Sequence, residues 1–156
     1  MKIYIGKREE YSSFELLQKA YWIRYSETVS EESIVRNSNG KPYFKSLTMP
    51  FFSISHSGDY LACVFDEDEV GLDIQKIRRI PQIVIRKYLH TVSTDPVQQI
   101  FEWTKIESYG KMNGSGIPTE DDYDQGVFVS TSELDGYAIT ICTKSEKNQA
   151  IELVYI

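Results

Sequence analysis

The chain has 156 residues, 41% of them hydrophobic and 13% aromatic, which is enough for one compact domain with a core of its own. Its formal net charge of -6 argues against nucleic acid as a partner, because such binding uses a basic face to neutralise phosphates. No stretch reaches the roughly 18 apolar residues of a membrane span, and the N-terminal MKIYIGKREE lacks the apolar core of a secretory signal. We therefore expect a cytoplasmic protein without membrane contact.

The first part of the chain is rich in strand signals. MKIYIG at the N-terminus alternates polar and apolar residues, as a strand does, and Ser12 or Ser13 can cap a helix from Phe14 to about Glu27. SIVRNSNGKPYF predicts two extended pieces around an Asn39-Gly40 turn. Three further extended segments follow: FFSISHSG, YLACVF and VGLDIQ. We expect the last two to pair as a hairpin across the acidic DEDE turn.

The second part of the chain mixes helices and strands. PQIVIRKYLH has a helical apolar pattern, and VQQIFEWTKIESYGKM is the clearest helix, ended by NGSG. GVFVSTSELDGYAITICT predicts a hairpin about Asp135-Gly136, and AIELVYI predicts a closing strand. Helices and strands do not alternate strictly, so the fold class is α+β.

The two cysteines give no framework for disulfides or zinc. Cys63 and Cys142 each lie in apolar, strand-like sequence, and neither has a nearby second cysteine. We interpret them as small buried hydrophobic residues in a reducing compartment.

The clearest helix presents chemically useful residues at a spacing of four. Trp103, Glu107 and Lys111 share one face, which Ile100 and Thr104 extend. A simple explanation is an ion pair between Glu107 and Lys111 on the helix surface, which would contribute only about 0.2–0.5 kcal/mol. An acid and a base on a face shared with tryptophan and isoleucine also suit a partly buried site.

Asp73 and His56 are the other candidates for chemistry. Asp73 lies in a strand among apolar neighbours, where an unpaired carboxylate costs several kcal/mol, so it must bond to backbone amides, pair with a cation or bind a metal. His56 lies between two serines before Gly58, a segment that can offer hydroxyls, an imidazole and amides to a phosphate. Lys41 adds a cation upstream.

The order of these motifs is specific. GKPYF, FSISHSG, VGLDIQ and WTKIESYGK together resemble the motif series of the 4′-phosphopantetheinyl transferase superfamily, in particular its Sfp-like, pseudo-dimeric branch. The resemblance extends over roughly residues 39–116 and continues loosely to DGYAITI. It implies two similar α+β halves, here about residues 1–68 and 69–156, with the active site in the cleft between them. A chain containing both halves could form that cleft as a monomer.

The resemblance also implies a role for each matching residue. Asp73 and Glu107 would bind Mg²⁺ and, with Lys111, would be catalytic, and Gln75 would lie at a third metal position. Lys41, Ser55, His56 and Lys111 would hold the phosphates of coenzyme A. The implied enzyme transfers 4′-phosphopantetheine from coenzyme A to a serine of an acyl or peptidyl carrier protein and releases adenosine 3′,5′-bisphosphate.

The residue types suit that reaction. Attack of a serine hydroxyl on a pyrophosphate needs a metal to neutralise phosphate oxygens, a base for the hydroxyl proton and a cation beside the developing charge. Two carboxylates from separate elements, with substrate oxygens and waters, suit the hard oxygen preference of Mg²⁺.

The sequence also departs from the family pattern. Gln75 replaces an acidic residue found in many relatives, and Ile106 replaces a lysine, although Lys105 is adjacent. The basic stretch that grips the 3′-phosphate of coenzyme A is short, and four residues could substitute for it: Lys7, Arg8, Lys19 and Arg24.

Two classes of function therefore remain open. One is the transferase, and the other is a degenerate relative that binds a carrier protein or coenzyme A without transfer. The retention of Asp73, Glu107 and Lys111 together favours the enzyme. A metal phosphohydrolase of another family would need more carboxylates or histidines than the sequence offers.

Overall fold

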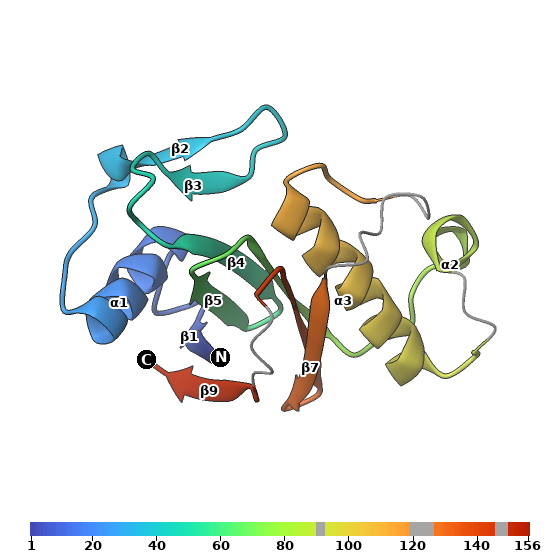
Figure 1. Cartoon of the computed structure of the whole chain (residues 1–156). Coiled ribbons are helices and arrows are strands. Elements are labelled where there is room, and N and C mark those ends of the chain that lie inside the picture. The colour runs from blue at the N-terminus through green and yellow to red at the C-terminus, as the bar shows by residue number, and fades with distance from the viewer. Residues whose placement is uncertain (90–92, 119–126, 146–149) are drawn as a thin grey trace.

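The computed structural model describes residues 1–89, 93–118, 127–145 and 150–156. They form an α+β fold with two main sheets, each covered by a helix, and a third sheet of two short strands (Figure 1). Strand order in the first sheet is β4-β5-β1-β9, with β1 antiparallel to β5 and parallel to β9. The bounds are β1 Lys2–Lys7, β4 Phe51–Ser57, β5 Tyr60–Asp66 and β9 Glu152–Tyr155. Helix α1 (Ser13–Tyr25) begins at Ser12, whose side chain accepts from the Glu15 amide in a capping box, and it packs on β5 and β1.

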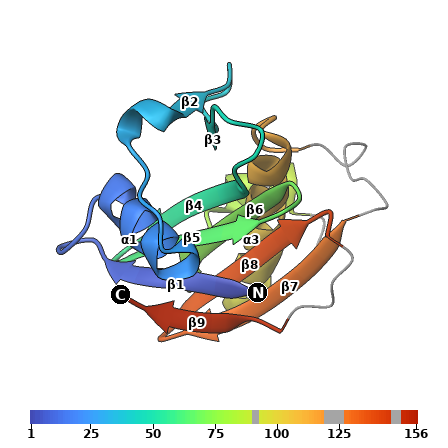
Figure 2. The ribbon, with the colours of Figure 1, turned by 60° about the vertical axis from the view of Figure 1, so that its left-hand side comes forward.

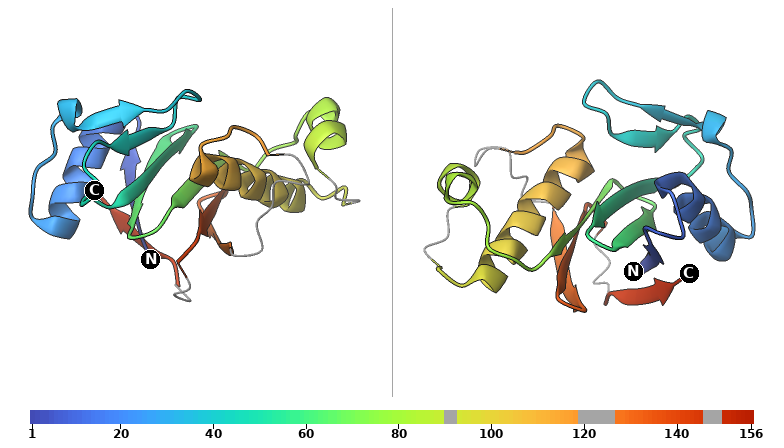
Figure 3. Two further views of the ribbon diagram at one scale, coloured as in Figure 1. Left: turned by 45° about the horizontal axis from the view of Figure 1, so that its top comes forward. Right: turned by 180° about the vertical axis from the view of Figure 1, so that it is seen from behind.

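The second sheet has the order β6-β8-β7 and is covered by α3 (Figure 3). Its strands are β6 Val70–Lys76, β7 Phe128–Leu134 and β8 Tyr137–Thr143, and β7 and β8 form the expected hairpin about Asp135-Gly136. Helix α3 (Pro96–Asn113) begins after Asp95, whose carboxylate accepts from the Val97 amide, and ends where Gly114 takes a φ of 66°. The short α2 spans Gln82–Tyr88, so the predicted helix is confirmed there, whereas its last residue, His90, lies outside the described residues.

Two short strands form an arm beside the first sheet (Figure 2). The arm consists of β2 (Ile34–Arg36) and β3 (Pro42–Phe44), preceded by a 3-10 turn η1 at Glu31–Ser33. Its turn contains Gly40 at a φ of 85°, as the Asn39-Gly40 pair predicts. The amide nitrogens of the Asn37 and Asn39 side chains both donate to the carbonyl of Gly114, at 3.1 and 2.8 Å. The arm is thereby tied to the C-terminal end of α3.

The expected hairpin between YLACVF and VGLDIQ is wrong. Strand β5 pairs with β4 and with β1, whereas β6 pairs with β8 in the other sheet. Because β5 is central and all its residues are buried, neither of its edges is free for β6. At the end of β5, Asp66 accepts from the Thr143 hydroxyl at 2.8 Å, which ties this end of the strand to the second sheet.

The two sheets meet where the edge strands β4 and β6 lie next to each other (Figure 2). Their backbones are not paired as a ladder. Instead, three hydroxyls of β4 accept hydrogen bonds from backbone amides of β6: Ser53 from Leu72 at 3.0 Å, Ser55 from Ile74 at 3.2 Å and Ser57 from Lys76 at 3.0 Å. The period-two spacing of these serines matches the pleat of a strand. We call this contact the serine seam.

Two main apolar clusters stabilise the fold. One joins the two sheets and includes Ile3, Val64, Leu72 and Ile139, each 0% exposed. The other lies between α1 and the first sheet. Cys63 and Cys142 are buried free thiols, as predicted, and no described helix is long and apolar enough to cross a membrane.

Candidate active site

Asp73 is a buried carboxylate near the middle of β6, with its side chain 1% exposed. Its Oδ1 accepts from the Ser55 hydroxyl at 2.8 Å and from the Lys111 ammonium at 2.6 Å. Its Oδ2 is buried and has no hydrogen-bond partner in the described part of the chain. Leaving a carboxylate oxygen without a partner costs free energy, so this oxygen indicates a place for a further positive group.

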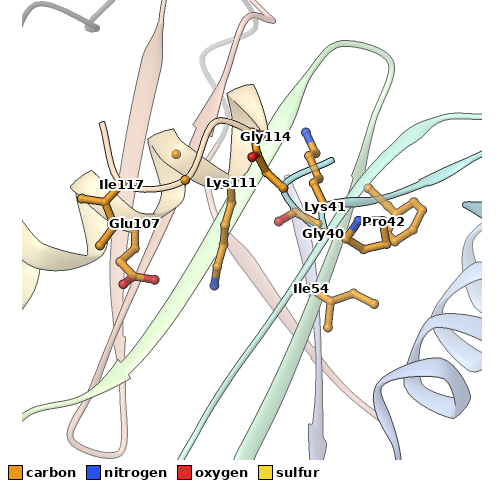
Figure 4. A pocket seen from close by; sticks show the side chains of 13 residues that line it. Gly40, Lys41, Pro42, Ile54, Glu107, Lys111, Gly114 and Ile117 are labelled. Atoms are coloured by element: carbon orange, nitrogen blue, oxygen red, sulfur yellow. Dashed lines mark hydrogen bonds between the residues drawn. The ribbon is translucent and has the colours of Figure 1, made fainter. Parts of the chain in front are cut away.

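Glu107 and Lys111 lie one turn apart on α3 and point to the same side of the helix, as their spacing predicts (Figure 4). Lys111 bonds to Asp73, and Glu107 is near enough to feel the charge of Asp73. Burial raises the pKa of Glu107 above its usual value, and the nearby charge of Asp73 raises it further, while Lys111 acts in the opposite direction. A raised pKa makes the carboxylate a stronger base, which favours acceptance of a proton. The three residues thus combine two carboxylates with one ammonium.

A cavity of about 280 Å³ lies beside this group. Figure 4 shows its walls, which come from three elements: the arm, β4 and the C-terminal end of α3. The labelled lining residues are Gly40, Lys41, Pro42, Ile54, Glu107, Lys111, Gly114 and Ile117. The cavity therefore has Glu107 and Lys111 on one wall and a largely apolar surface opposite them.

Lys41 lines the cavity, but its ammonium is already engaged. It donates to the carbonyl of Met112 at 2.5 Å, in the last turn of α3, where a cation is favoured by the helix dipole. Burial lowers the pKa of Lys41. With Asn37 and Asn39 it holds the end of α3, a role that the sequence did not predict for the two asparagines.

Ser55 and His56 have different surroundings, although they are adjacent in sequence. Ser55 is 3% exposed, and its hydroxyl contacts Asp73, Lys111 and the Ile74 amide. Since side chains alternate along a strand, His56 points to the opposite face of β4, which it shares with the cavity-lining Ile54. His56 is exposed, and its imidazole makes no hydrogen bond with any residue that the structure describes.

The remaining predicted residues lie farther from this centre. Gln75 is half-buried two residues beyond Asp73 on the same face of β6, and the Ser57 hydroxyl donates to its side-chain oxygen at 3.4 Å. The four basic residues considered for the 3′-phosphate of coenzyme A do not line the cavity: Lys7, Arg8, Lys19 and Arg24. Lys19, for example, donates a hydrogen bond to the Tyr11 hydroxyl at 2.8 Å.

Helix α3 is positioned by an unusually close approach to the sheet. At Gly71 a side chain would collide with the backbone of Ser108 and Met112, so only glycine fits there. Between the helix and the sheet, the hydroxyls of Thr104 and Thr140 lie 2.7 Å apart, and both residues are fully buried. A glycine within a strand is a known sign of close backbone approach, and it was the sequence signal available for this contact.

The donor set of Asp73 and Glu107 fits a hard divalent cation. Mg²⁺ is commonly held by one or two carboxylates together with substrate phosphates and waters. The partnerless Oδ2 of Asp73, close to the second carboxylate, is the feature of this structure that matches such an ion. No group of three or more histidine, cysteine or acidic side chains in the described residues could surround a metal, so the other ligands would come from substrate or water.

Fold and site together define an α+β protein with a carboxylate-lysine centre where two sheets meet. Among known proteins, the chain is 30% identical over 127 residues to the 4′-phosphopantetheinyl transferase gsp of Aneurinibacillus migulanus, covering 73% of this chain and 53% of that protein. It is 31% identical over 129 residues to the 4′-phosphopantetheinyl transferase AcpT of Escherichia coli O157:H7, covering 70% and 65%. It is also 31% identical over 88 residues to the 4′-phosphopantetheinyl transferase Sfp of Bacillus subtilis, covering 50% and 39%.

The chain belongs to the 4′-phosphopantetheinyl transferase superfamily, as its motif series predicts. No family model matches the sequence. The alignments with these three relatives span between 39% and 65% of the relatives' own length.

Proposed function

We propose that this protein transfers 4′-phosphopantetheine from coenzyme A to a serine of an acyl or peptidyl carrier protein, with Mg²⁺ as cofactor, and releases adenosine 3′,5′-bisphosphate. The observation that supports this most directly is the buried Asp73 beside Glu107. One of its oxygens pairs with Lys111, and the other has no hydrogen-bond partner among the described residues. The similar proteins described above are all named 4′-phosphopantetheinyl transferases, which agrees with the proposed reaction.

In this proposal Asp73 and Glu107 hold the metal. A bound Mg²⁺ would neutralise pyrophosphate oxygens and so lower the barrier to attack. Gln75, on the same face of β6 as Asp73, would lie close enough to reach a water of that ion. Glu107 would also take up the proton of the carrier serine, which agrees with its raised pKa.

Lys111 would stabilise the charge that develops on the leaving phosphate. Without substrate, its ammonium bonds to Asp73 at 2.6 Å and to Ser55 at 2.7 Å, and its side chain is 31% exposed to the cavity side. A cation already held in place loses little reorganisation energy when charge develops beside it. Lys41 and His56 are the other phosphate-binding candidates, because Lys41 lines the cavity and His56 shares its face of β4 with the cavity-lining Ile54.

We also propose that the chain consists of two similar halves of about residues 1–68 and 69–156, with the site in the cleft between them. The strand orders β4-β5-β1 and β7-β8-β6 support this. In each half the first strand is followed by a helix and later by an antiparallel hairpin, and the second strand of that hairpin pairs with the first strand of the half. Strand β9 joins the first sheet although it belongs to the second half by sequence. One chain would then supply both walls of the cleft as a monomer. The buried thiols of Cys63 and Cys142 agree with a reducing, cytoplasmic location.

The experiment is the intact mass of a panel of apo carrier proteins after incubation with this protein, coenzyme A and Mg²⁺. We expect at least one carrier to gain one phosphopantetheine, and we expect Asp73→Ala and Glu107→Ala to abolish the gain while the protein stays folded. Glu102→Ala is the matched control, because Glu102 lies on the same helix and pairs with Lys105 at the surface.

Three results would contradict the proposal. If Asp73→Ala or Glu107→Ala retained near wild-type turnover in Mg²⁺, the metal assignment would be wrong. If no carrier gained mass although coenzyme A bound, the protein would be the degenerate binding relative. If Lys111→Ala lost only as much melting temperature as Lys105→Ala and kept its turnover, Lys111 would be a surface ion-pair partner.

A further inference from the structure

The hydroxyl of Ser55 is engaged in every direction in which it can form a hydrogen bond. It donates its proton to Asp73 Oδ1 at 2.8 Å, and it accepts from the Ile74 amide at 3.2 Å and the Lys111 ammonium at 2.7 Å. A serine hydroxyl has one donor and two acceptor positions, so this one has none left. Because it is also 3% exposed, it cannot serve as a ligand for a phosphate of coenzyme A without losing one of these bonds.

The neighbouring serines of the serine seam show what is special about Ser55. Ser53 accepts from the Leu72 amide, and Ser57 accepts from the Lys76 amide, in the same way as Ser55 accepts from Ile74. Among the described residues, neither Ser53 nor Ser57 forms a hydrogen bond with Asp73 or Lys111, whereas Ser55 bonds to both. The shared bond joins the two sheets, and the additional bonds of Ser55 concern the carboxylate and the ammonium of the site.

We infer that Ser55 is a positioning residue for Asp73 and not a phosphate ligand: its hydroxyl fixes Oδ1, so that Oδ2 keeps its orientation toward the metal. This inference rests on the proposed role of Asp73 as a Mg²⁺ ligand. A carboxylate on a strand can rotate about its last bond, and a hydrogen bond to one oxygen fixes the direction of the other. Groups that hold metal ligands from behind change metal affinity about 10- to 100-fold when they are removed.

The test is a calorimetric titration of Mg²⁺ into the protein saturated with coenzyme A. Ser55→Ala should weaken Mg²⁺ binding about 10- to 100-fold. Ser53→Ala removes the equivalent bond to β6 and is the matched control. We expect it to lower the melting temperature about as much as Ser55→Ala and to leave Mg²⁺ affinity within about twofold. Ser53 also borders the cavity, so this control is judged by metal affinity and not by turnover.

A second titration separates the two roles of Ser55. Binding of coenzyme A is measured in EDTA, where a lost phosphate ligand would weaken it and the loss of a residue that positions Asp73 for the metal would not. Lys111 keeps its bond to Asp73 in this variant, so it stays in place without Ser55. We expect the coenzyme A affinity of Ser55→Ala to stay within about twofold of the wild type. If Ser55→Ala does not fold, Ser55→Cys keeps a donor that is weaker than the hydroxyl, and a smaller loss of Mg²⁺ affinity in the same direction is expected with it.

The possible failures can be told apart. If Asp73→Ala keeps its Mg²⁺ affinity, the proposed metal site itself is wrong. If Asp73→Ala loses Mg²⁺ but Ser55→Ala behaves like Ser53→Ala, the positioning role is overturned while the proposed function stands. Weakened coenzyme A binding by Ser55→Ala in EDTA, with normal Mg²⁺ affinity, would likewise overturn the inference in favour of a phosphate contact.

Discussion

The two sheets of this protein are each covered by a helix, but the two helices pack in different ways. The buried residues of α1 are apolar or aromatic: Leu16, Leu17, Ala20 and Tyr21. They meet an aromatic group in which the Tyr21 ring lies 5.6 Å from both Phe44 and Phe65. Helix α3 instead buries several polar side chains against its sheet, among them Gln99, Thr104 and Ser108.

The glycines under the two helices show the same contrast. Gly6 in β1 faces the tip of the Leu16 side chain, so α1 is separated from its sheet by side chains. Gly71 in β6 faces the backbone of α3 directly. Large apolar contacts stabilise without fixing direction, whereas close backbone contact and buried hydroxyl pairs fix a helix in one place. The α1 layer is thus suited to stability, and the α3 layer to the position of Glu107 and Lys111.

The strongest test of this contrast is one methyl group added under each helix. Gly71→Ala should destabilise the protein by about 3 kcal/mol or more, because the methyl meets backbone atoms that cannot move aside. Gly6→Ala should cost about 1 kcal/mol or less, because the Leu16 tip can adopt another rotamer. Urea unfolding with an unchanged m-value measures both. Equal losses would show that the two helices are equally close to their sheets.

A smaller loss of stability is expected when the buried hydroxyl pair between α3 and β8 is broken. Thr104 donates its proton to the carbonyl of Phe101, so the Thr140 hydroxyl is the donor to Thr104. Thr104→Val should cost about 1–3 kcal/mol, because it leaves the buried Thr140 hydroxyl without an acceptor.

The double variant completes this test as a mutant cycle. Thr140→Val should cost less than Thr104→Val, since Thr104 keeps Phe101 as acceptor. Thr104→Val combined with Thr140→Val should recover most of the loss, because no polar group is then left unpaired. Strict additivity of the two single variants in urea unfolding would argue against the bond.

The smallest effect concerns the charge of Glu107. Burial, and then the charge of Asp73, raise the pKa of Glu107, so the folded protein holds this proton more tightly than the unfolded chain does. The free energy of unfolding therefore falls as pH rises from the ordinary glutamate pKa of about 4.3 through the higher pKa that Glu107 has in the folded protein. Without metal, Glu107→Gln should raise the melting temperature at pH 7 by less than the threonine changes lower it.

This gain should depend on pH. The melting temperatures of Glu107→Gln and wild type should converge below about pH 4, where glutamate is protonated in both states. Scans in EDTA from pH 3.5 to 8 measure this, with Glu102→Gln as the control for loss of a carboxylate from the same helix. A gain that is the same at every pH would show that the charge of Glu107 is not its cause.

The sequence predicted the elements better than their pairing. Capping residues and turn glycines are local signals, so α1, α3 and the Asp135-Gly136 hairpin follow from nearby residues. The pairing of β6 does not follow from nearby residues, because its partner β8 lies far along the chain, beyond both α2 and α3. Proximity in sequence therefore predicted β5 as the partner of β6, although both edges of β5 pair with other strands, β4 and β1.

For the site, helical spacing predicted that Glu107 and Lys111 share a face, and the cost of an unpaired buried carboxylate predicted a partner for Asp73. The different settings of Ser55 and His56 were harder to foresee. They occupy one motif, yet the pleat sends one to the serine seam and the other to the opposite face. A motif comparison treats both as neighbours of one ligand, whereas the backbone alternation separates them.

The serine seam has a consequence for how the site comes into being. Each sheet completes its own ladder without the other, because only hydroxyls cross from β4 to β6. Asp73 belongs to one sheet and Ser55 to the other, so docking of the two layers and assembly of the carboxylate centre are a single event. The apolar cluster that joins the two sheets is buried by the same docking, since it draws Ile3 and Val64 from one sheet and Leu72 and Ile139 from the other. The proposed metal site can therefore be organised only in a molecule whose central core has already formed.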